Sequence, residues 1–467
     1  MTIANSLKSH QYSDRNSLHC NGDDGPVMTN ASVLLRLTGT ASRAQPHEIR
    51  AALLAFACNF ILLASYYILR PLRDTMATVF GVQALQSLFT GTFVITLVCA
   101  PVFAWCASKM KLARLLPGVF WILLINLLIF YVLFRLAPQN RWLAAGFFWW
   151  FSVINLFLIS IFWTFMADVF APAQAKRLFA FIAAGGSTGA IAGPIITRSL
   201  VGIIGVSGLL LVAGAGFLCV ILLIHALMRE KQKLRVNDET AQQTTLDHSL
   251  PGNPLRGFAL LLKSRFLLNQ AAFMLLMTWI ATIFYFLQTD IIAKTFPGVE
   301  SRAVAFADVD LFVNACSAII LIFGLGRVLQ RFGVTAGLLL TPVLMVGACL
   351  AIAVAPSFLL IQAARATQRI SQYAIARPSR EVLFTVVDQQ SKYKAKNVID
   401  TAVYRFGDLS SAWMLAGLRA AGFGLLGAMT FGITVSAAWG VVAVALGRRY
   451  EVLSGSWRVK SVSASAE

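Results

Sequence analysis

Residues 51–79 read AALLAFACNFILLASYYILRPLRDTMATV, and this stretch decides the fold class of the chain. Residues 51–69 are apolar except for one asparagine and one serine. An apolar helix of about 20 residues crosses the hydrocarbon core of a bilayer, which is about 30 Å thick. The stretch therefore predicts a membrane-spanning helix whose last turns carry Arg70, Arg73 and Asp74.

The rest of the chain repeats this pattern. Of its 467 residues, 58% are hydrophobic and 13% are charged, whereas soluble domains average about 25% charged residues. We therefore expect an all-α polytopic membrane protein with twelve transmembrane helices in two six-helix halves. The other eleven runs lie near residues 84–107, 116–135, 142–167, 178–201, 204–228, 267–295, 303–325, 333–353, 357–387, 397–420 and 424–446.

Polar segments divide the chain into five parts. Residues 1–48 are expected to form a disordered cytoplasmic tail, and residues 229–265 a cytoplasmic linker with two prolines. The linker separates an N-terminal half, 49–228, from a C-terminal half, 266–448. A second cytoplasmic tail, 449–467, ends the chain.

The net charge of +19 raises the question of nucleic-acid binding. The basic residues are concentrated in alternate loops, however, and cytoplasmic loops of membrane proteins are enriched in Lys and Arg. The charge therefore predicts that both termini are cytoplasmic and gives no indication of a nucleic-acid partner. Seven cysteines occur without CxxC or CxxH spacing, so neither a disulfide framework nor a metal site is expected.

The two halves share short motifs at nearly one offset. The pattern D-x-x-A-x-x-F occurs at Asp74 and again at Asp290, and an aspartate precedes a lysine by eight residues at Asp168 and at Asp388. The offsets are 216 and 220 residues. Parallel halves of the major-facilitator kind place such repeats in equivalent helices, with the substrate site between the halves near the bilayer midplane.

Ionisable residues inside the predicted spans indicate function, since a charge at the bilayer centre costs about 2.5–3.5 kcal/mol on insertion scales. Arg70, Arg73 and Asp74 are candidates, although the two arginines would also suit outer headgroups. The tenth helix carries a polar face, unless residues 362–381 form a long loop instead. Its polar residues are Gln362, Arg365, Gln368, Arg369, Gln372, Arg377, Arg380 and Glu381.

Arginine presents a planar set of donors that fits phosphate and carboxylate, so these residues predict an anionic substrate. The candidate binding residues are Arg70, Arg73, Asp74, Arg369, Arg380 and Glu381. Asp74 and Glu381 either balance the arginines in the empty site or take up protons. The start of the eleventh helix adds a possible cytoplasmic gate, formed by Asp400, Tyr404, Arg405 and Asp408.

Two further patterns predict packing. Gly185, Gly189 and Gly193 recur every four residues, as close contact between helices requires. The aromatic run FFWWF, residues 147–151, is typical of an aromatic belt at the outer boundary of a bilayer.

Three segments resemble the ATP/ADP translocase family of plastids and intracellular bacteria, a branch of the major-facilitator type. They are YYILRPLRDT (66–75), FWTFMAD (162–168) running to AKRLF (175–179), and REVLF (380–384) running to KAKNVID (394–400). The resemblance implies nucleotide-binding roles for Arg73 and for the pair Arg380 and Glu381. It departs from the family where no acidic residue occurs within 142–167 or 267–289, and where arginine replaces the usual lysine.

We therefore expect a secondary transporter of a small anionic solute, with nucleotide exchange of the ATP/ADP type as one option. A proton-coupled transporter or exporter of an unrelated solute is the alternative. No catalytic or cofactor-binding constellation is recognised, so an enzyme is not expected. The expected surroundings are membrane lipids in a bacterial inner membrane, with no obligate protein partner indicated.

Overall fold

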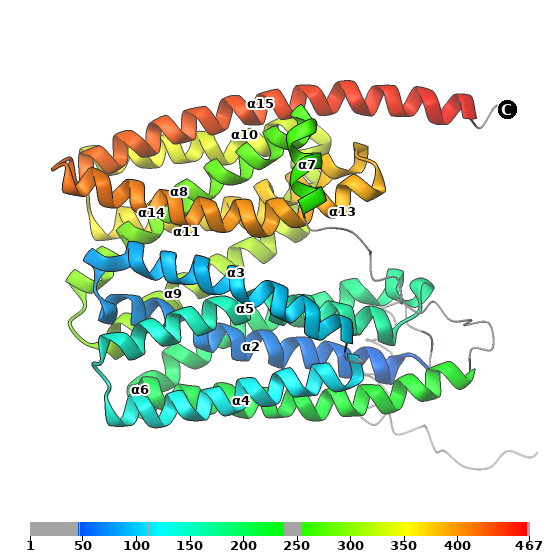
Figure 1. Ribbon diagram of the computed structural model, residues 1–467, viewed down its shortest axis with the longest axis horizontal. Coiled ribbons are helices and arrows are strands. Elements are labelled where there is room, and N and C mark those ends of the chain that lie inside the picture. Colours follow the sequence, from blue (N-terminus) through cyan, green and yellow to red (C-terminus); the bar gives the residue numbers. More distant parts are fainter. Residues whose placement is uncertain (1–44, 46, 110–111, 238–254, 465–467) are drawn as a thin grey trace, which may run out of the picture.

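The computed structural model describes residues 45, 47–109, 112–237 and 255–464, and the regular structure within these ranges is helical throughout. Figure 1 shows the helices aligned side by side in two layers. One layer holds α2, α4, α5 and α6, the other holds α8, α10, α11, α14 and α15, and α3 and α9 lie between them. The fold is therefore an all-α arrangement of two helical halves.

The first half is formed by long helices. α2 packs along α6 and α5, and α4 packs on α6. The bounds are α2 Ile49–Phe80, η1 Val82–Ala84, α3 Leu85–Lys109, α4 Leu112–Leu136, α5 Arg141–Val169 and α6 Pro172–Asn237.

The second half contains shorter pieces. α8 packs on α15 and α14, and the short α7 packs on α13. The bounds are α7 Leu255–Lys263, α8 Arg265–Thr295, α9 Val299–Ile319, η2 Ile320–Gly324, α10 Leu325–Val354, α11 Phe358–Ser371, η3 Gln372–Ala376, α12 Arg377–Leu383, η4 Phe384–Val386, α13 Gln389–Val398, η5 Ile399–Val403, α14 Tyr404–Ala420 and α15 Gly424–Ala464.

Eight helical segments among the described residues are long and apolar enough to cross a bilayer. Two of them, Pro172–Lys231 and Val299–Val354, have 60 and 56 residues, and each is long enough for two spans of about 20 residues. Each is broken by one glycine with positive φ, Gly205 at 70° and Gly333 at 78°. With those breaks, and with the more polar helices 358–386 and 389–420, the arrangement is consistent with the twelve expected helices.

The tenth predicted helix is helical throughout. α11, η3, α12 and η4 follow one another without interruption from Phe358 to Val386. The alternative of a long loop over residues 362–381 was therefore wrong. η3 is a π-helical turn, Gln372–Ala376, which inserts extra backbone in the middle of this polar helix.

The segments predicted as tails and linker are partly helical. The linker begins as a continuation of α6 to Asn237 and ends in α7, and residues 238–254 lie outside the described part of the chain. The last helix continues to Ala464, well past its expected end at residue 446. Most of the predicted N-terminal tail, residues 1–44 and 46, also lies outside the described residues, whereas Glu48 is buried and pairs with Arg177 at 2.8 Å.

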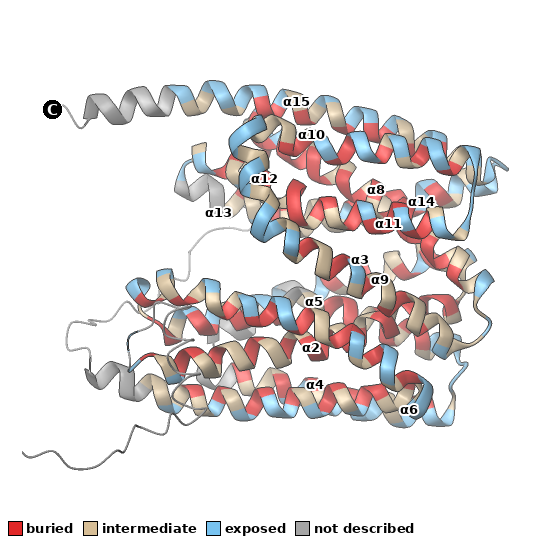
Figure 2. Ribbon diagram, turned by 180° about the vertical axis from the view of Figure 1, so that it is seen from behind, coloured by how far each residue is buried: buried red, intermediate tan, exposed pale blue. Residues whose placement is uncertain are grey.

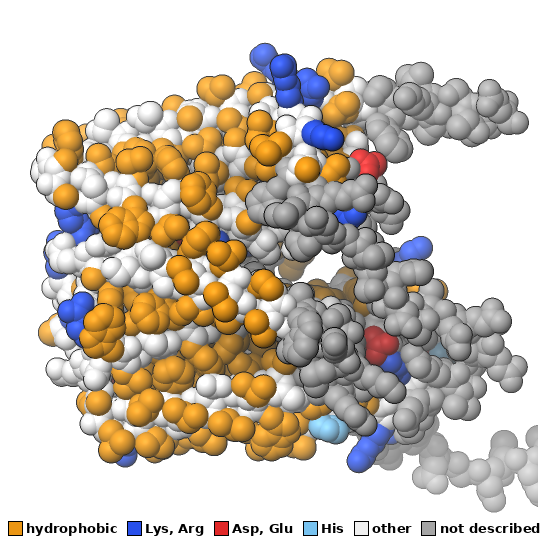
Figure 3. Space-filling view, viewed as in Figure 1, with side chains coloured by type: hydrophobic (Ala, Val, Ile, Leu, Met, Phe, Trp, Pro, Cys, Tyr) orange, Lys and Arg blue, Asp and Glu red, His pale blue; other side chains and the backbone are white. Residues whose placement is uncertain are grey.

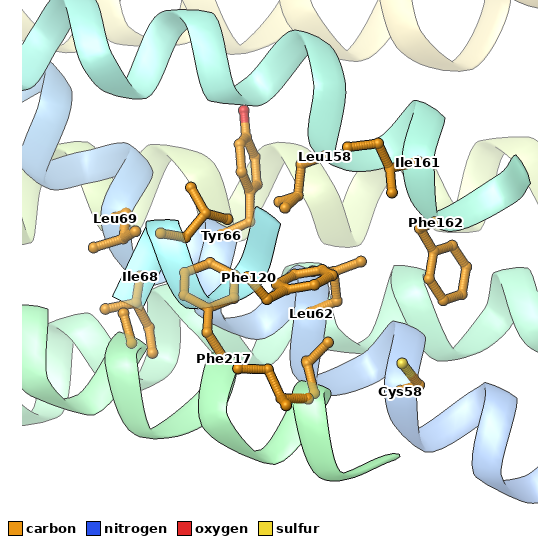
Figure 4. Close-up of a cluster of buried hydrophobic side chains, with 14 of the residues drawn as sticks. Cys58, Leu62, Tyr66, Ile68, Leu69, Phe120, Leu158, Ile161, Phe162 and Phe217 are labelled. Carbon is orange, nitrogen blue, oxygen red and sulfur yellow. The ribbon is translucent and has the colours of Figure 1, made fainter. Parts of the chain in front are cut away.

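Close packing between α2 and α6 supports the first half. A Cβ atom at Gly185 would lie 2.5 Å from the Phe56 carbonyl oxygen, and one at Gly193 would lie 2.6 Å from that of Ala64. This confirms the predicted glycine packing. Figure 4 shows the adjoining apolar cluster, in which side chains of α2, α4, α5 and α6 meet around Leu62 and Phe120.

The predicted aromatic belt was wrong. Phe147, Phe148 and Phe151 are almost fully buried, and they pack inside the protein against Phe130, Phe89 and Tyr66. In Figure 3, apolar side chains cover the middle of the visible face, and Lys and Arg side chains lie mainly towards its ends. In Figure 2, buried residues line the inward sides of α8, α11 and α14. Such an apolar middle band is the surface that a bilayer covers.

Candidate functional site

A buried carboxylate joins arginines from the two halves. Asp310 on α9 is 1% exposed, and its Oδ1 lies 2.5 Å from Nη1 of Arg369 on α11. Its Oδ2 lies 3.8 Å from Nε of Arg70 on α2. Arg70 also donates a hydrogen bond from Nη2 to the hydroxyl of Tyr373, at 3.3 Å. The predicted residues Arg70 and Arg369 are thus brought together by Asp310.

A second carboxylate, that of Asp74, lies one turn beyond Arg70 on α2. Asp74 accepts hydrogen bonds from Arg73, 2.9 Å from Nε, and from the hydroxyl of Tyr285 on α8, at 3.1 Å. The Arg73 guanidinium lies over the rings of Phe148 and Tyr285, at 5.0 and 5.9 Å. These contacts hold Arg73 inside the protein rather than at a headgroup surface.

Arg365 belongs to a network of amides. It donates from Nε to Gln288 at 3.2 Å, and from Nη1 to Gln368 at 2.7 Å and to the Ala281 carbonyl at 3.0 Å. Gln288 in turn donates to Gln362 at 3.1 Å. The predicted polar face of the tenth helix is thus packed against α8 through hydrogen bonds.

Tyr373 connects the arginines on the tenth helix. The Arg369 and Arg377 guanidinium groups lie 5.8 and 5.1 Å from the centre of its ring. Since η3 is a π-helical turn, Tyr373 and Arg377 are offset from the positions that a regular α-helix would give them.

The central group of charges is unbalanced. It contains five guanidinium groups, of Arg70, Arg73, Arg365, Arg369 and Arg377, but two carboxylates, of Asp74 and Asp310. Among the described residues, Nε and Nη2 of Arg369 and Nε of Arg377 are buried without a hydrogen-bond acceptor. Leaving a charged donor unpaired is costly. The group thus carries more positive charge and more donors than its own acceptors satisfy.

Two predicted binding residues lie apart from this group. Arg380 follows Arg377 by three residues, but its partners differ from those of the central group, since it pairs with Asp400 at 2.6 Å and with Glu381 at 3.3 Å. Glu381 also pairs with Lys396 at 2.5 Å. Arg380 contacts the Met274 sulfur at 3.2 Å. Arg380 and Glu381 therefore form a separate ion-pair cluster within the second half, and their role in binding stays a prediction.

The four predicted gate residues fall into two groups. Asp400 belongs to the Arg380 cluster. Arg405 lies 3.7 Å from Asp408, has its guanidinium 5.8 Å from the Tyr404 ring centre, and donates to the carbonyl of Ser152 on α5 at 3.0 Å. Asp408 accepts from Thr282 on α8 at 3.3 Å. Arg405 thus joins the two halves, and a gating function stays a prediction.

Sequence reasoning missed Asp310. The sequence does contain a signal for Asp310, because Asp308 and Asp310 lie within the apolar run AFADVDLFVNA, which is part of a predicted membrane span. It also missed Tyr285 and Tyr373, which look like ordinary core aromatics in the sequence. Among the described residues, no group of three or more His, Cys, Asp or Glu side chains could hold a metal ion.

Comparisons of sequence agree with this architecture. A family model described as Major Facilitator Superfamily matches residues 55–363, more than half of the chain. The chain is 22% identical to "ADP,ATP carrier protein 1" of Chlamydia trachomatis serovar D over 449 residues, 82% of this chain and 84% of the relative. It is 21% identical to the protein of the same name from Chlamydia pneumoniae, over 82% of this chain and 87% of the relative. The resemblance found in the sequence is confirmed.

Solved structures show the same fold. A bacterial homologue of the iron transporter ferroportin, in an inward-facing state, has a TM-score of 0.58 at 12% identity and covers 86% of this chain and 98% of that one. The nucleoside transporter NupG has a TM-score of 0.55 at 14% identity, covering 86% of this chain and 99% of that one. The major-facilitator-like fold predicted from the sequence is confirmed.

Proposed function

This chain belongs to the Major Facilitator Superfamily, and we propose that it moves a small anionic solute by alternating access between its two halves. It is a multi-pass membrane protein with the fold of a secondary transporter. We place it in a bacterial plasma membrane with both termini in the cytoplasm. The halves are residues 49–228 and 266–448, connected by a cytoplasmic linker.

The observation that carries the proposal is the surplus of buried and half-buried guanidinium groups. Five arginines share two carboxylates, and Arg369 and Arg377 keep buried N–H donors without acceptors. A bound anion would supply those acceptors and cancel the excess positive charge. It would thereby offset the free-energy cost of burying unpaired guanidinium donors. A neutral or cationic solute would leave both costs in place.

Nucleotides are the anions that fit best. Arginine binds phosphate oxygens through two parallel donors, and the curated relatives are carriers of ADP and ATP by name. We propose exchange of the ATP/ADP type, with Arg70, Arg73 and Arg369 holding the phosphates. Arg380 and Glu381 would act at a second stage, nearer the cytoplasmic end of the tenth helix.

The geometry supports a mechanism in which the anion takes the place of Asp310. Asp310 holds Arg369 and lies near Arg70, so that it links the two halves through charge. Oxygens of the substrate would accept hydrogen bonds from the same guanidiniums and from the free donors of Arg369. The halves would then move relative to one another around a neutralised site.

Counterflow tests the proposal. Proteoliposomes preloaded with unlabelled ADP are expected to accumulate labelled ATP or ADP, and Arg369→Ala is expected to reduce this uptake at least tenfold. Arg327→Ala is the matched control, because Arg327 is an exposed arginine bonded to the Phe323 carbonyl. The absence of counterflow in folded wild-type protein, or full activity of Arg369→Ala, would overturn the proposal.

Proton coupling is the second candidate, and the buried carboxylates favour it. Asp74 is 7% exposed and bonded to Tyr285, and a proton on it would change the charge of the site. In that case uptake would collapse with an uncoupler and would not require internal substrate. Exchange predicts the reverse of both results.

A further inference from the structure

A cavity of about 300 Å³ lies between the two halves, next to the arginines. Helices α2, α5 and α6 of the first half line it, together with α9 and Tyr373 of the second half. Two lining tyrosines touch the arginine group, since Arg70 lies 5.5 Å from the ring of Tyr67 and bonds to the hydroxyl of Tyr373. A ligand bound to the arginines would therefore reach into this space.

The walls of the cavity suit a flat apolar body. Leu62, Phe162 and Trp163 contribute apolar and aromatic surface, and Ala183, Gly186 and Ala190 of α6 leave room opposite them. These apolar and aromatic surfaces favour an aromatic ring over a second anionic group, because a ring packs against aromatic side chains.

Two asparagines line the cavity in the same way. Asn59 on α2 donates from Nδ2 to the Ile182 carbonyl at 2.8 Å, and Asn314 on α9 donates to the Ala190 carbonyl at 2.7 Å. Both acceptors belong to α6, so one helix fixes both amides. Turning either amide over would bring two oxygens face to face, and the Nδ2 assignment is therefore settled by the contact itself.

Each anchored amide has its carbonyl oxygen left for a ligand. No hydrogen bond to Oδ1 of Asn59 or Asn314 is made by the side chains and backbone that the structure describes. Gly186 contributes to this arrangement, because a Cβ there would lie 2.6 Å from Nδ2 of Asn59. The cavity thus presents one amide from each half, and each amide offers its Oδ1 as an acceptor beside the second N–H of its Nδ2.

We propose that this cavity is a subsite for a flat ring carrying an amino group, and that Asn59 and Asn314 determine its selection. The proposal rests on the proposed function, with the anionic part of the same molecule held by the arginines. Carbonyl oxygens accept hydrogen bonds from an amino group, as on adenine. A ring that carries a carbonyl oxygen at that place, as on hypoxanthine, would set a second acceptor against Oδ1 and could bond through the remaining Nδ2–H alone.

Adenosine and inosine test the subsite without the anion. Both lack phosphate, and they differ at the ring position that carries either an amino group or an oxygen. We expect adenosine to raise the Tm of the purified wild-type protein, and inosine to need about a tenfold higher concentration for the same shift. Equal shifts, or no shift with either nucleoside, would overturn the proposal without any variant.

Variants then assign the selection to the asparagines. Asn59→Ala and Asn314→Ala are expected to lose the preference for adenosine and to keep the shift produced by pyrophosphate. Asn126→Ala is the control, because the Asn126 amide also donates to a backbone carbonyl, that of Ile122 at 2.7 Å, but within its own helix α4 and away from the cavity. Retention of the preference in both cavity variants would contradict the assignment.

The two proposals fail differently. If pyrophosphate and ADP neither shift the Tm nor support counterflow, the anion-transport proposal fails, whatever the nucleosides do. If anions bind and are exchanged with no preference for an amino-bearing ring, the subsite proposal fails and transport stands.

Discussion

Asp310 is the residue on which the charge balance of the site depends. Its side chain is 2% exposed, and it lies beside Arg70 of the first half and Arg369 of the second half. Removing one partner of a buried ion pair costs about 3–5 kcal/mol, because the remaining charge is left uncompensated. An anion that binds to Arg70 and Arg369 would supply the missing compensation.

Asp310→Asn is therefore expected to lower the Tm of the ligand-free protein, and ADP or pyrophosphate is expected to restore more of that loss than it adds to wild type. Thermal unfolding of the purified protein with and without the anion measures both effects. Asp308→Asn is the control, since Asp308 is 40% exposed and pairs with Arg198 at 2.9 Å, which is worth about 0–1 kcal/mol. A loss of stability that no anion restores would count against this role.

At the scale of single residues, the sequence predicted the arginines and the partners Asp74 and Glu381, but not Asp310 or Tyr373. Arg70, Arg73 and Arg369 stand out because charge is rare in apolar spans. Their pairing with Asp310 and Tyr373 depends on which helices become neighbours and on the π-helical turn at 372–376, and neither is visible in local spacing. Arg380 and Glu381 follow the central arginines closely in sequence, but Arg380 pairs with Glu381 and Asp400 instead of with the central carboxylates.

At the scale of helices, the contact between α2 and α6 is the clearest case of sequence dictating structure. Gly185, Gly189 and Gly193 lie against backbone atoms of α2, where a side chain would collide with carbonyl oxygens. This contact supports the helix that carries Arg70 and Arg73. The geometry of the site therefore depends on the glycines.

Gly193→Ala is expected to destabilise the protein by about 1–3 kcal/mol through overpacking, because its Cβ would lie 2.6 Å from the Ala64 carbonyl oxygen and 2.7 Å from Tyr67 Cβ. Gly202→Ala, in the same helical segment, meets no atom within 4 Å and is expected to be neutral or slightly stabilising. Thermal unfolding compares the two. A Gly193→Ala protein as stable as Gly202→Ala would contradict the packing account.

Most helices were predictable from apolar runs, and the exceptions have physical causes. The burial of FFWWF was missed because aromatic residues suit both a core and a membrane boundary. The extensions of α6 to Asn237 and α15 to Ala464 were missed because these segments are polar, and hydropathy cannot distinguish a polar helix from a loop.

At the scale of the whole molecule, polar contacts join the halves at the end predicted to face outward. Arg302 on α9 donates to Thr78 on α2 at 3.1 Å, and Arg419 on α14 donates to Gln83 of η1 at 3.0 Å. Arg302 also donates to the carbonyls of Phe296 and Ala293, at 2.7 and 3.2 Å. Arg302 thus links α2 to the end of α8, beside the second contact between the halves made by Arg419.

Arg302→Ala is expected to shift the population towards an outward-open state. In a variant without native cysteines, Ser317→Cys places a thiol in the cavity between the halves, and an impermeant thiol reagent added outside should label it several-fold faster when Arg302 is absent. Lys294→Ala is the control, because Lys294 is exposed and pairs within its own helix with Asp290 at 2.6 Å. Equal labelling with and without Arg302 would refute the closure.

The most direct test of the anion site is equilibrium binding of ADP to the purified protein by calorimetry. The surplus of guanidinium groups predicts that wild type and Arg327→Ala bind ADP with equal affinity. Arg369→Ala and Arg377→Ala are each expected to bind ADP at least tenfold more weakly, a loss of about 1.4 kcal/mol or more. Unchanged ADP affinity in both of these variants, with the protein folded, would contradict the account.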